Sequence, residues 1–170
     1  LGIGMLHQDP LDVPSLTVLD NFSLGRKLPR FQRRREARQK LLNACARFGF
    51  RLDPDARAGG LTVGERQQLE LVRLLSLGVR VVILDEPTTG ISVPQRALLF
   101  ETLRGLASEG FTIIFVSHKL DEFVELCSEA TVLRQGKVAG NATAPFSTDQ
   151  LVRTMFGQYA TPSSRPTAPL

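Results

Sequence analysis

Apolar residues recur along the first part of the chain with the spacing of helices, separated by turn residues. Gly2 to Leu6 is typical of a short strand that leads into a loop. Thr17 is placed to cap a short helix through Leu24, and Pro29 predicts a break. Beyond it, apolar residues recur four, seven and eleven positions after Ala37, which is the pattern of one helical face. The members of this face are Ala37, Leu41, Ala44 and Phe48, and Gly49 is expected to end the helix.

Two further helix starts share one capping pattern. Thr62 is followed three residues later by Glu65. Ser92 is followed three residues later by Gln95, with Pro94 in the first turn, where proline is tolerated. In each pair the hydroxyl and the longer side chain can bond the N–H groups that a helix N-terminus leaves without partners. The expected ends of these two helices are Gly78 and Gly110.

Two mainly apolar runs, Val79 to Leu84 with Arg80 inside it and Phe111 to Val116 with Thr112 inside it, are expected to be strands buried on both faces of a parallel sheet. After them, residues 131–133 and 137–139 flank Gln-Gly, which favours a small hairpin. Ser147 and Gln150 can cap a last short helix to Phe156. The preceding helix is expected to present an apolar stripe of Leu120, Phe123, Val124 and Cys127.

Strands that alternate with helices predict an α/β fold with a mainly parallel sheet. The segment from about residue 17 to 77 is helical and interrupts this alternation. We therefore expect an α/β core, formed by residues 1–16 and 78–157, with an inserted helical subdomain. Residues 158–170 have the Pro/Ser/Thr-rich composition of a linker or tail. The two cysteines, Cys45 and Cys127, lack metal-ligand spacing, and two buried, reduced thiols are expected.

Basic charge is concentrated in one segment. The whole sequence has a formal net charge of +4, whereas Arg26 to Arg57 holds 11 basic and 3 acidic residues, a local balance of +8. Such a segment is typical of a solvated helix face, or of a surface that binds nucleic acid or an anionic membrane. The solvated face is the commoner of these, and we favour it.

Polar residues with catalytic potential follow the predicted strands. Asp85 and Glu86 come directly after an apolar run, at the end of a strand where α/β sheets bind ligands. Asp85 is placed to hold Mg²⁺ through water, and Glu86 to polarise a water that attacks a phosphate. His118 follows the next apolar run and can bond a γ-phosphate, while Gln8 can bridge a metal-bound water. For Asp85 and Glu86 we favour the catalytic interpretation over an acidic turn after a strand, whereas His118 or Gln8 taken alone is more typical of a structural residue.

The segment Leu61 to Glu65, with the sequence LTVGE, places a hydroxyl and a glycine at a predicted helix start. Backbone N–H groups at such a start are free to bind an anion, and the helix dipole favours negative charge there. The segment by itself is also consistent with a simple well-capped helix. The segment begins at Leu61, and Asp85 follows 24 residues later. This spacing favours the binding interpretation.

Together, these motifs resemble those of the ATP-binding-cassette (ABC) ATPases, over the chain up to about Gly157. The resemblance implies a partial P-loop NTPase (RecA-like) fold. Within this family, three segments are similar in sequence to bacterial sugar or nucleoside importers: VPSLTVLDNFSLGR, LTVGE and SHKLDEF. The matches are Gln8 to the Q-loop, Leu61 to Glu65 to the signature motif, Val81 to Glu86 to Walker B, Thr89 to Ser92 to the D-loop, and His118 to the switch histidine.

The resemblance implies a mechanism in which two cassettes enclose two ATP molecules with Mg²⁺. In each site one cassette supplies the catalytic residues and the metal ligands, and its partner supplies the signature motif. ATP hydrolysis then drives transmembrane permease subunits, which a substrate-binding protein serves, so the chain is expected at the cytoplasmic side of the plasma membrane as a peripheral protein. The implied roles are catalysis for Glu86, His118 and Gln8, Mg²⁺ binding for Asp85 and Gln8, contact with the partner's ATP for Thr62, Val63, Gly64 and Glu65, and the D-loop for Ser92.

The sequence departs from the family pattern in several places. Val63 and Glu65 replace the usual glycine and glutamine of the signature motif, and Ser92 replaces the usual D-loop aspartate. The sequence does not predict how these changes affect the rate of hydrolysis. No G-x-x-x-x-G-K-[ST] phosphate loop occurs in the 170 residues, nor does the aromatic residue that stacks on the nucleotide. In the family both precede the Q-loop, so we expect them upstream of Leu1 and expect the chain alone to bind MgATP weakly or not at all.

Two other functions stay open at this stage. A soluble ABC-type ATPase that acts on nucleic acid or ribosomes is supported only by the basic cluster from Arg33 to Arg38. A non-catalytic interaction domain would leave Glu86 and His118 dispensable. We favour the importer, for which nucleic acid is not an expected partner. The sequence predicts neither the transported solute nor a second cassette after the linker.

Overall fold

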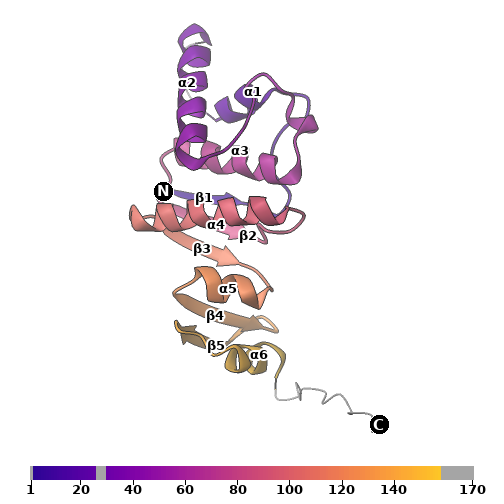
Figure 1. Cartoon of the computed structure of the whole chain (residues 1–170), viewed down its shortest axis with the longest axis vertical. Coiled ribbons are helices and arrows are strands. Elements are labelled where there is room, and N and C mark those ends of the chain that lie inside the picture. The colour runs from indigo at the N-terminus through magenta and orange to yellow at the C-terminus, as the bar shows by residue number, and fades with distance from the viewer. Residues whose placement is uncertain (1, 26–29, 158–170) are drawn as a thin grey trace, which may run out of the picture. The chain divides into compact units, whose positions relative to one another are not determined.

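The computed structural model of the chain describes residues 2–25 and 30–157 (Figure 1). The predicted break at Pro29 and the predicted linker over 158–170 lie outside the described residues. The contacts divide the chain into two compact units, Leu1–Val116 and Ser117–Leu170.

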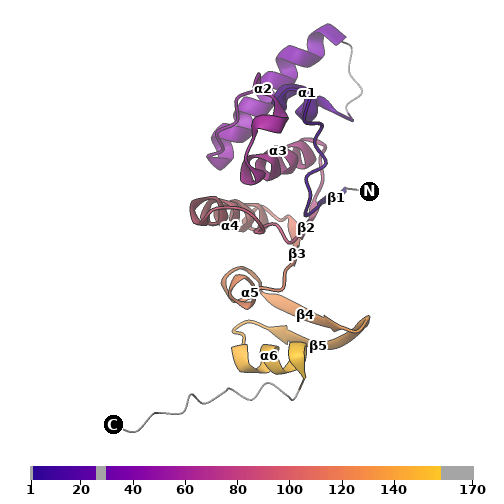
Figure 2. The ribbon, with the colours of Figure 1, turned by 90° about the vertical axis from the view of Figure 1, so that its right-hand side faces the viewer.

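The first unit is built on a sheet of three parallel strands, β1 (Ile3–Leu6), β2 (Val81–Asp85) and β3 (Thr112–Val116), with β2 in the middle. Helix α3 (Val63–Ser76) precedes β2, and α4 (Val93–Ser108) connects β2 to β3. Figure 2 shows both helices on the same side of the strands. The alternation of parallel strands and helices confirms the predicted α/β fold.

One face of this sheet, here called the packed face, lies against α3 and α4. Gly4 on β1 approaches Leu74 of α3, and Phe115 on β3 meets Phe100 of α4 edge to face, with ring centroids 5.9 Å apart. Val82 of β2 is fully buried. By strand register, the packed face comprises Gly4, Leu6, Val82, Leu84, Ile113 and Phe115.

The other face, here called the open face, corrects a prediction. Ile114 and Val116 are 45% and 46% exposed, and Ile3 is 56% exposed. The prediction that both apolar runs are buried on both faces is therefore wrong for the described residues. The reason is topological, because no described element of the first unit covers this side of the strands. The apolar residues of the open face are Ile3, Met5, Val81, Ile83, Ile114 and Val116, and the same register places Thr112 and Asp85 on it.

The helical part of the first unit follows β1 and precedes β2. Helix α1 (Val18–Ser23) begins at Thr17, whose hydroxyl accepts from the backbone N–H of Asp20, as predicted. Helix α2 (Arg30–Phe48) contains the predicted apolar face that starts at Ala37, and a 3-10 turn, η1 (Ala58–Gly60), leads to α3. The buried face of α2 is Ala37, Leu41 and Cys45, whereas the predicted members Ala44 and Phe48 are only half-buried.

Both predicted capping boxes are present. The hydroxyl of Thr62 caps α3 and that of Ser92 caps α4, and in each box the side chain three residues on returns a bond to the backbone of the cap. The buried residues of α4 include Leu99, Leu103 and Leu106.

The second unit contains α5 (Leu120–Leu126), the antiparallel pair β4 (Glu129–Arg134) and β5 (Lys137–Thr143), and α6 (Thr148–Phe156). The predicted hairpin turns at Gln135 and Gly136, which both have positive φ, at 52° and 74°. Such a pair fits the twist of an antiparallel hairpin. Ser147 caps α6 as predicted.

The predicted apolar stripe of α5 is only partly correct. Val124 is 48% exposed, while Glu122 is completely buried. Cys127 is half-buried, so only Cys45 is a buried thiol as predicted. Burial raises the pKa of both thiols, which keeps them protonated at neutral pH. The seven residues of α5 are too few to specify a buried face by periodicity alone.

Candidate functional site

The carboxyl end of β2 holds the two acidic residues that the sequence singles out. Asp85 is the last residue of β2, and Glu86 follows it with a φ of 47°. Few residues other than glycine adopt a positive φ, and such strained positions cluster at functional sites. The N–H of Glu86 donates to the carbonyl of Val116 at 2.9 Å, and its own carbonyl accepts from the N–H of Thr89 at 3.1 Å. The strained backbone is therefore held by β3 and by the turn that follows.

Gln8 lies near the same edge of the sheet. It follows β1 by two residues, and β1 pairs with β2 so that Leu6 stands opposite Leu84. The carboxyl ends of parallel strands meet at one edge, so Gln8 and Asp85 are both presented there. Gln8 is exposed and Asp85 half-buried.

The loop after Gln8 is joined to helix α3 by an ion pair that the sequence did not predict. The Nη2 of Arg66 donates to Oδ2 of Asp12 at 2.9 Å, and Nε lies 2.9 Å from Oδ1. The Asp12 side chain is only 3% exposed, so the carboxylate depends on this partner. The two residues are 54 positions apart, and no local pattern pairs them.

The LTVGE segment forms the start of α3. The backbone N–H of Thr62 donates to the Glu65 carboxylate at 2.8 Å, and the Thr62 hydroxyl accepts from the Glu65 N–H at 3.3 Å. Glu65, one of the departures from the family pattern, thus completes the cap. Val63 is 40% exposed, whereas Gly64 is buried.

Ser92 and its helix lie beside this segment. The Nε2 of Gln95 donates to the Thr62 hydroxyl at 3.3 Å, across 33 positions of sequence. The structure therefore brings the LTVGE segment and the Ser92 turn together. The sequence analysis identified both caps but not the bond between them.

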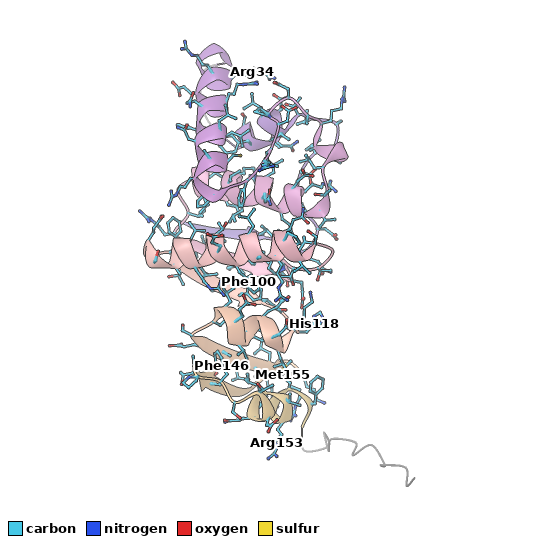
Figure 3. All side chains as sticks on the ribbon, in the orientation of Figure 1. Arg34, Phe100, His118, Phe146, Arg153 and Met155 are labelled. Carbon is cyan, nitrogen blue, oxygen red and sulfur yellow. The ribbon has the colours of Figure 1, made fainter. Side chains whose placement is uncertain are left out.

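His118 belongs to the second unit, where it is exposed two residues before the start of α5 in the sequence (Figure 3). The residues beside it are held by the buried Glu122. The Ser117 hydroxyl donates to Oε2 of Glu122 at 2.9 Å, and Nζ of Lys119 lies 3.4 Å from Oε1. Ser117 also accepts from the Lys119 N–H at 3.1 Å. Glu122 is a residue that the sequence analysis did not single out.

The described residues contain no group of three His, Cys, Asp or Glu side chains that could hold a metal ion by themselves. Mg²⁺ does not require one, because it is usually bound through one or two carboxylates, with water and phosphate oxygens as the other ligands. Asp85, the last residue of β2, supplies one such carboxylate.

The basic segment forms ion pairs within the helical part of the first unit. Nη1 of Arg34, labelled in Figure 3, lies 2.8 Å from Oδ1 of Asp20, and Arg38 makes two hydrogen bonds to Asp55, of 3.0 and 2.7 Å. The bonds from Arg38 hold the pKa of Asp55 below its usual value. The pKa of Asp20 is also lowered, chiefly by a hydrogen bond from the Thr17 hydroxyl. These pairs favour the interpretation of a solvated helix face.

Within residues 2–25 and 30–157, no helix combines the length and the apolar character that a membrane span requires.

Comparison with known proteins relates this arrangement to a family. The family model described as ABC transporter matches residues 1–89. A ribose import ATP-binding protein of Rubrobacter xylanophilus is 40% identical over 164 residues, which are 93% of this chain and 32% of that protein. An arabinose import ATP-binding protein of Burkholderia cenocepacia is 38% identical over 162 residues, 92% of this chain and again 32% of the relative.

A solved structure agrees with these relatives. The protein cbiO1 of Clostridium perfringens, part of an ABC transporter complex, superimposes on this chain with a TM-score of 0.69 at 27% sequence identity. The match covers 84% of this chain and 57% of the cbiO1 chain. The chain spans about a third of the length of the curated relatives it matches. On the strength of the family match, the fold and the order of its motifs, this chain belongs to the ABC transporter family, as a partial P-loop NTPase domain close to the sugar-import cassettes.

Proposed function

We propose that the protein containing this chain is the ATP-binding and ATP-hydrolysing subunit of an ABC importer for a small solute such as a sugar or nucleoside. The observation that carries the proposal is Glu86, a carboxylate held at positive φ directly after the central strand. The names of the relatives, which are import ATP-binding proteins for ribose and arabinose, support a sugar as the solute.

In this proposal Asp85 and Gln8 would hold Mg²⁺, with water and phosphate oxygens as the other ligands. Bound Mg²⁺ would neutralise negative charge on the phosphates. Glu86 orients and polarises the water that attacks the γ-phosphate. His118 donates a hydrogen bond to the γ-phosphate, which fixes the reacting group.

The proposal assigns the start of α3 to a second cassette's ATP. Thr62, Val63, Gly64 and Glu65 would contact that nucleotide through the anion-binding helix start, with Ser92 in the D-loop beside them. Residues 17–77 would form a helical subdomain of an incomplete cassette domain, whose core is residues 1–16 and 78–157. This subdomain and the loop at Gln8 would face the permease subunits, with the protein bound peripherally at the cytoplasmic side of the plasma membrane.

The decisive experiment is Glu86→Gln in the full-length protein, with ATP hydrolysis measured at saturating MgATP. Loss of a positioned base lowers a rate by roughly 10²- to 10⁴-fold, and we expect a loss in this range. Glu101→Gln, an exposed carboxylate on α4, is the matched control and should hydrolyse ATP at the wild-type rate. Unchanged hydrolysis and transport in Glu86→Gln would contradict the proposal and favour a non-catalytic interaction domain.

A separate prediction concerns the 170 residues alone. Because they contain no G-x-x-x-x-G-K-[ST] loop to surround the phosphates, the isolated chain should bind MgATP weakly or not at all. Isothermal titration calorimetry measures this directly. Micromolar binding with turnover would show that phosphate binding does not require that loop.

A further inference from the structure

The side chain of Gln95 lies between two segments that belong to different helix starts. Its Oε1 accepts from the backbone N–H of Ser92 at 3.0 Å and from the Ser92 hydroxyl at 3.1 Å. Its Nε2 donates to the Thr62 hydroxyl at 3.3 Å. Thr62 in turn donates to the Glu65 carboxylate at 2.8 Å, so four side chains form one continuous hydrogen-bonded chain.

Chemistry fixes which way the Gln95 amide points. The backbone N–H of Ser92 can only donate, so the atom that bonds it must be the amide oxygen. The amide nitrogen is thereby directed to Thr62, whose hydroxyl oxygen can accept. A glutamate at this position would still cap α4 through its oxygens, but it could not donate to Thr62. The amide at 95 therefore supplies a link that capping alone does not need.

Close packing supports the same link. A Cβ added to Gly64 would lie 2.5 Å from Cδ of Gln95, so the carboxamide lies directly over the start of α3. A Cβ added to Gly90 would lie 3.7 Å from Cγ1 of Val63, which brings the turn before Ser92 into contact with the same segment. The absence of a side chain at Gly64 allows Gln95 to approach.

We propose that Gln95 is a positioning residue that couples the LTVGE segment to the turn between Glu86 and Ser92. The inference rests on the proposed function, in which that segment contacts the ATP of a partner cassette. A phosphate at the start of α3 would fix Thr62, and through Gln95 it would fix the turn that begins at Glu86. ATP bound at one site would thus influence the position of Glu86, which belongs to the second ATP site. The influence would pass through contacts within a single chain.

The test uses the full-length protein and the variant Gln95→Glu, which keeps the α4 cap and removes the donor to Thr62. Gln39→Glu, at an exposed position on α2, is the control for the added charge. We expect kcat for ATP hydrolysis to fall about tenfold in Gln95→Glu while KM for ATP changes less than about twofold, within the usual range of coupling between sites. The control should match the wild type in both constants.

Hydrogen exchange in the absence of nucleotide gives a readout that does not depend on hydrolysis. The N–H of Glu65, bonded to the Thr62 hydroxyl, should exchange about fivefold faster in Gln95→Glu, as expected for the loss of about one hydrogen bond. No change at Glu65 would overturn the link itself. Faster exchange with unchanged kcat would overturn the positioning role. A wild-type protein without ATPase activity would instead contradict the proposed function, and the exchange result would still decide whether Gln95 holds the start of α3.

A double-mutant cycle with Thr62→Val provides the final criterion. If Gln95 acts through Thr62, the losses in kcat of Thr62→Val and Gln95→Glu will not add, and the double variant will resemble Thr62→Val alone. Fully additive losses would overturn the proposed route.

Discussion

The packed and open faces of the three-stranded sheet are made from the same apolar runs, yet they have different surroundings. On the packed face, Leu84 and Val82 are fully buried against α3 and α4. On the open face, Ile114 and Val116 keep nearly half of their surface exposed. Strand residues of one composition can therefore be core or surface, and the neighbouring elements decide which. An apolar run predicts a strand reliably, but it does not predict what covers it.

The two faces should differ most in the free energy of unfolding that is lost when a leucine or isoleucine is truncated to alanine. Leu84→Ala removes fully buried methyl groups and leaves a cavity, so the free energy of unfolding should fall by about 3 kcal/mol. Ile114→Ala on the open face removes groups that are already partly hydrated and should cost less than about 1.5 kcal/mol. Urea denaturation of both variants measures the difference. Equal losses would abolish the distinction between the faces.

A second experiment isolates the aromatic contact of the packed face. Phe100 and Phe115 meet edge to face, and such pairs contribute about 0.5–1.5 kcal/mol beyond the burial of their area. The cycle of Phe100→Leu, Phe115→Leu and the double variant should give a coupling free energy in this range. A coupling near zero would mean that α4 is held to the sheet by burial alone.

Adding a methyl group to the packed face should destabilise the protein less than removing buried groups from it. In Gly4→Ala the new methyl would lie 3.0 Å from Cδ2 of Leu74 and 3.1 Å from Cγ1 of Val79, which should lower the free energy of unfolding by about 1 kcal/mol. Gly105→Ala is the matched control, because the residue is inside α4 and, apart from its chain neighbours and its own helix backbone, no atom lies within 4 Å of the new methyl. Alanine there should stabilise the protein by about 0.5–1 kcal/mol. Thermal unfolding of the two variants should shift in opposite directions.

The smallest expected change is on the open face. Ile114→Thr keeps the β-branched shape that strands favour and should alter the free energy of unfolding by less than about 0.5 kcal/mol. Because the variant reduces the exposed apolar patch, the binding of a hydrophobic dye should decrease. A loss of more than about 2 kcal/mol would show that Ile114 is buried in the protein under test.

The features that could be predicted from the sequence are those decided within a few residues. The caps at Thr62 and Ser92 and the turn at Gln135 follow from side chains three positions apart or fewer, and the structure confirms all three. The position of Asp85 and Glu86 at the carboxyl end of a strand was also predictable, because an apolar strand followed by polar residues is a local pattern.

The features that could not be predicted join distant parts of the chain. The bond from Gln95 to Thr62 and the ion pair of Asp12 with Arg66 span 33 and 54 positions. Charge and polarity at single positions do not specify such partners. The positive φ of Glu86 was equally hidden, because a glutamate gives no local signal for a conformation that glycine favours.

That backbone conformation has a consequence for laboratory evolution. A residue with a side chain at a φ of 47° costs on the order of 1 kcal/mol relative to glycine. Selection of a variant library for thermal tolerance alone should therefore enrich glycine or asparagine at position 86, whereas selection for the proposed ATP hydrolysis should retain glutamate. The residue preferred at this one position would then report whether a population is being selected for folding or for activity.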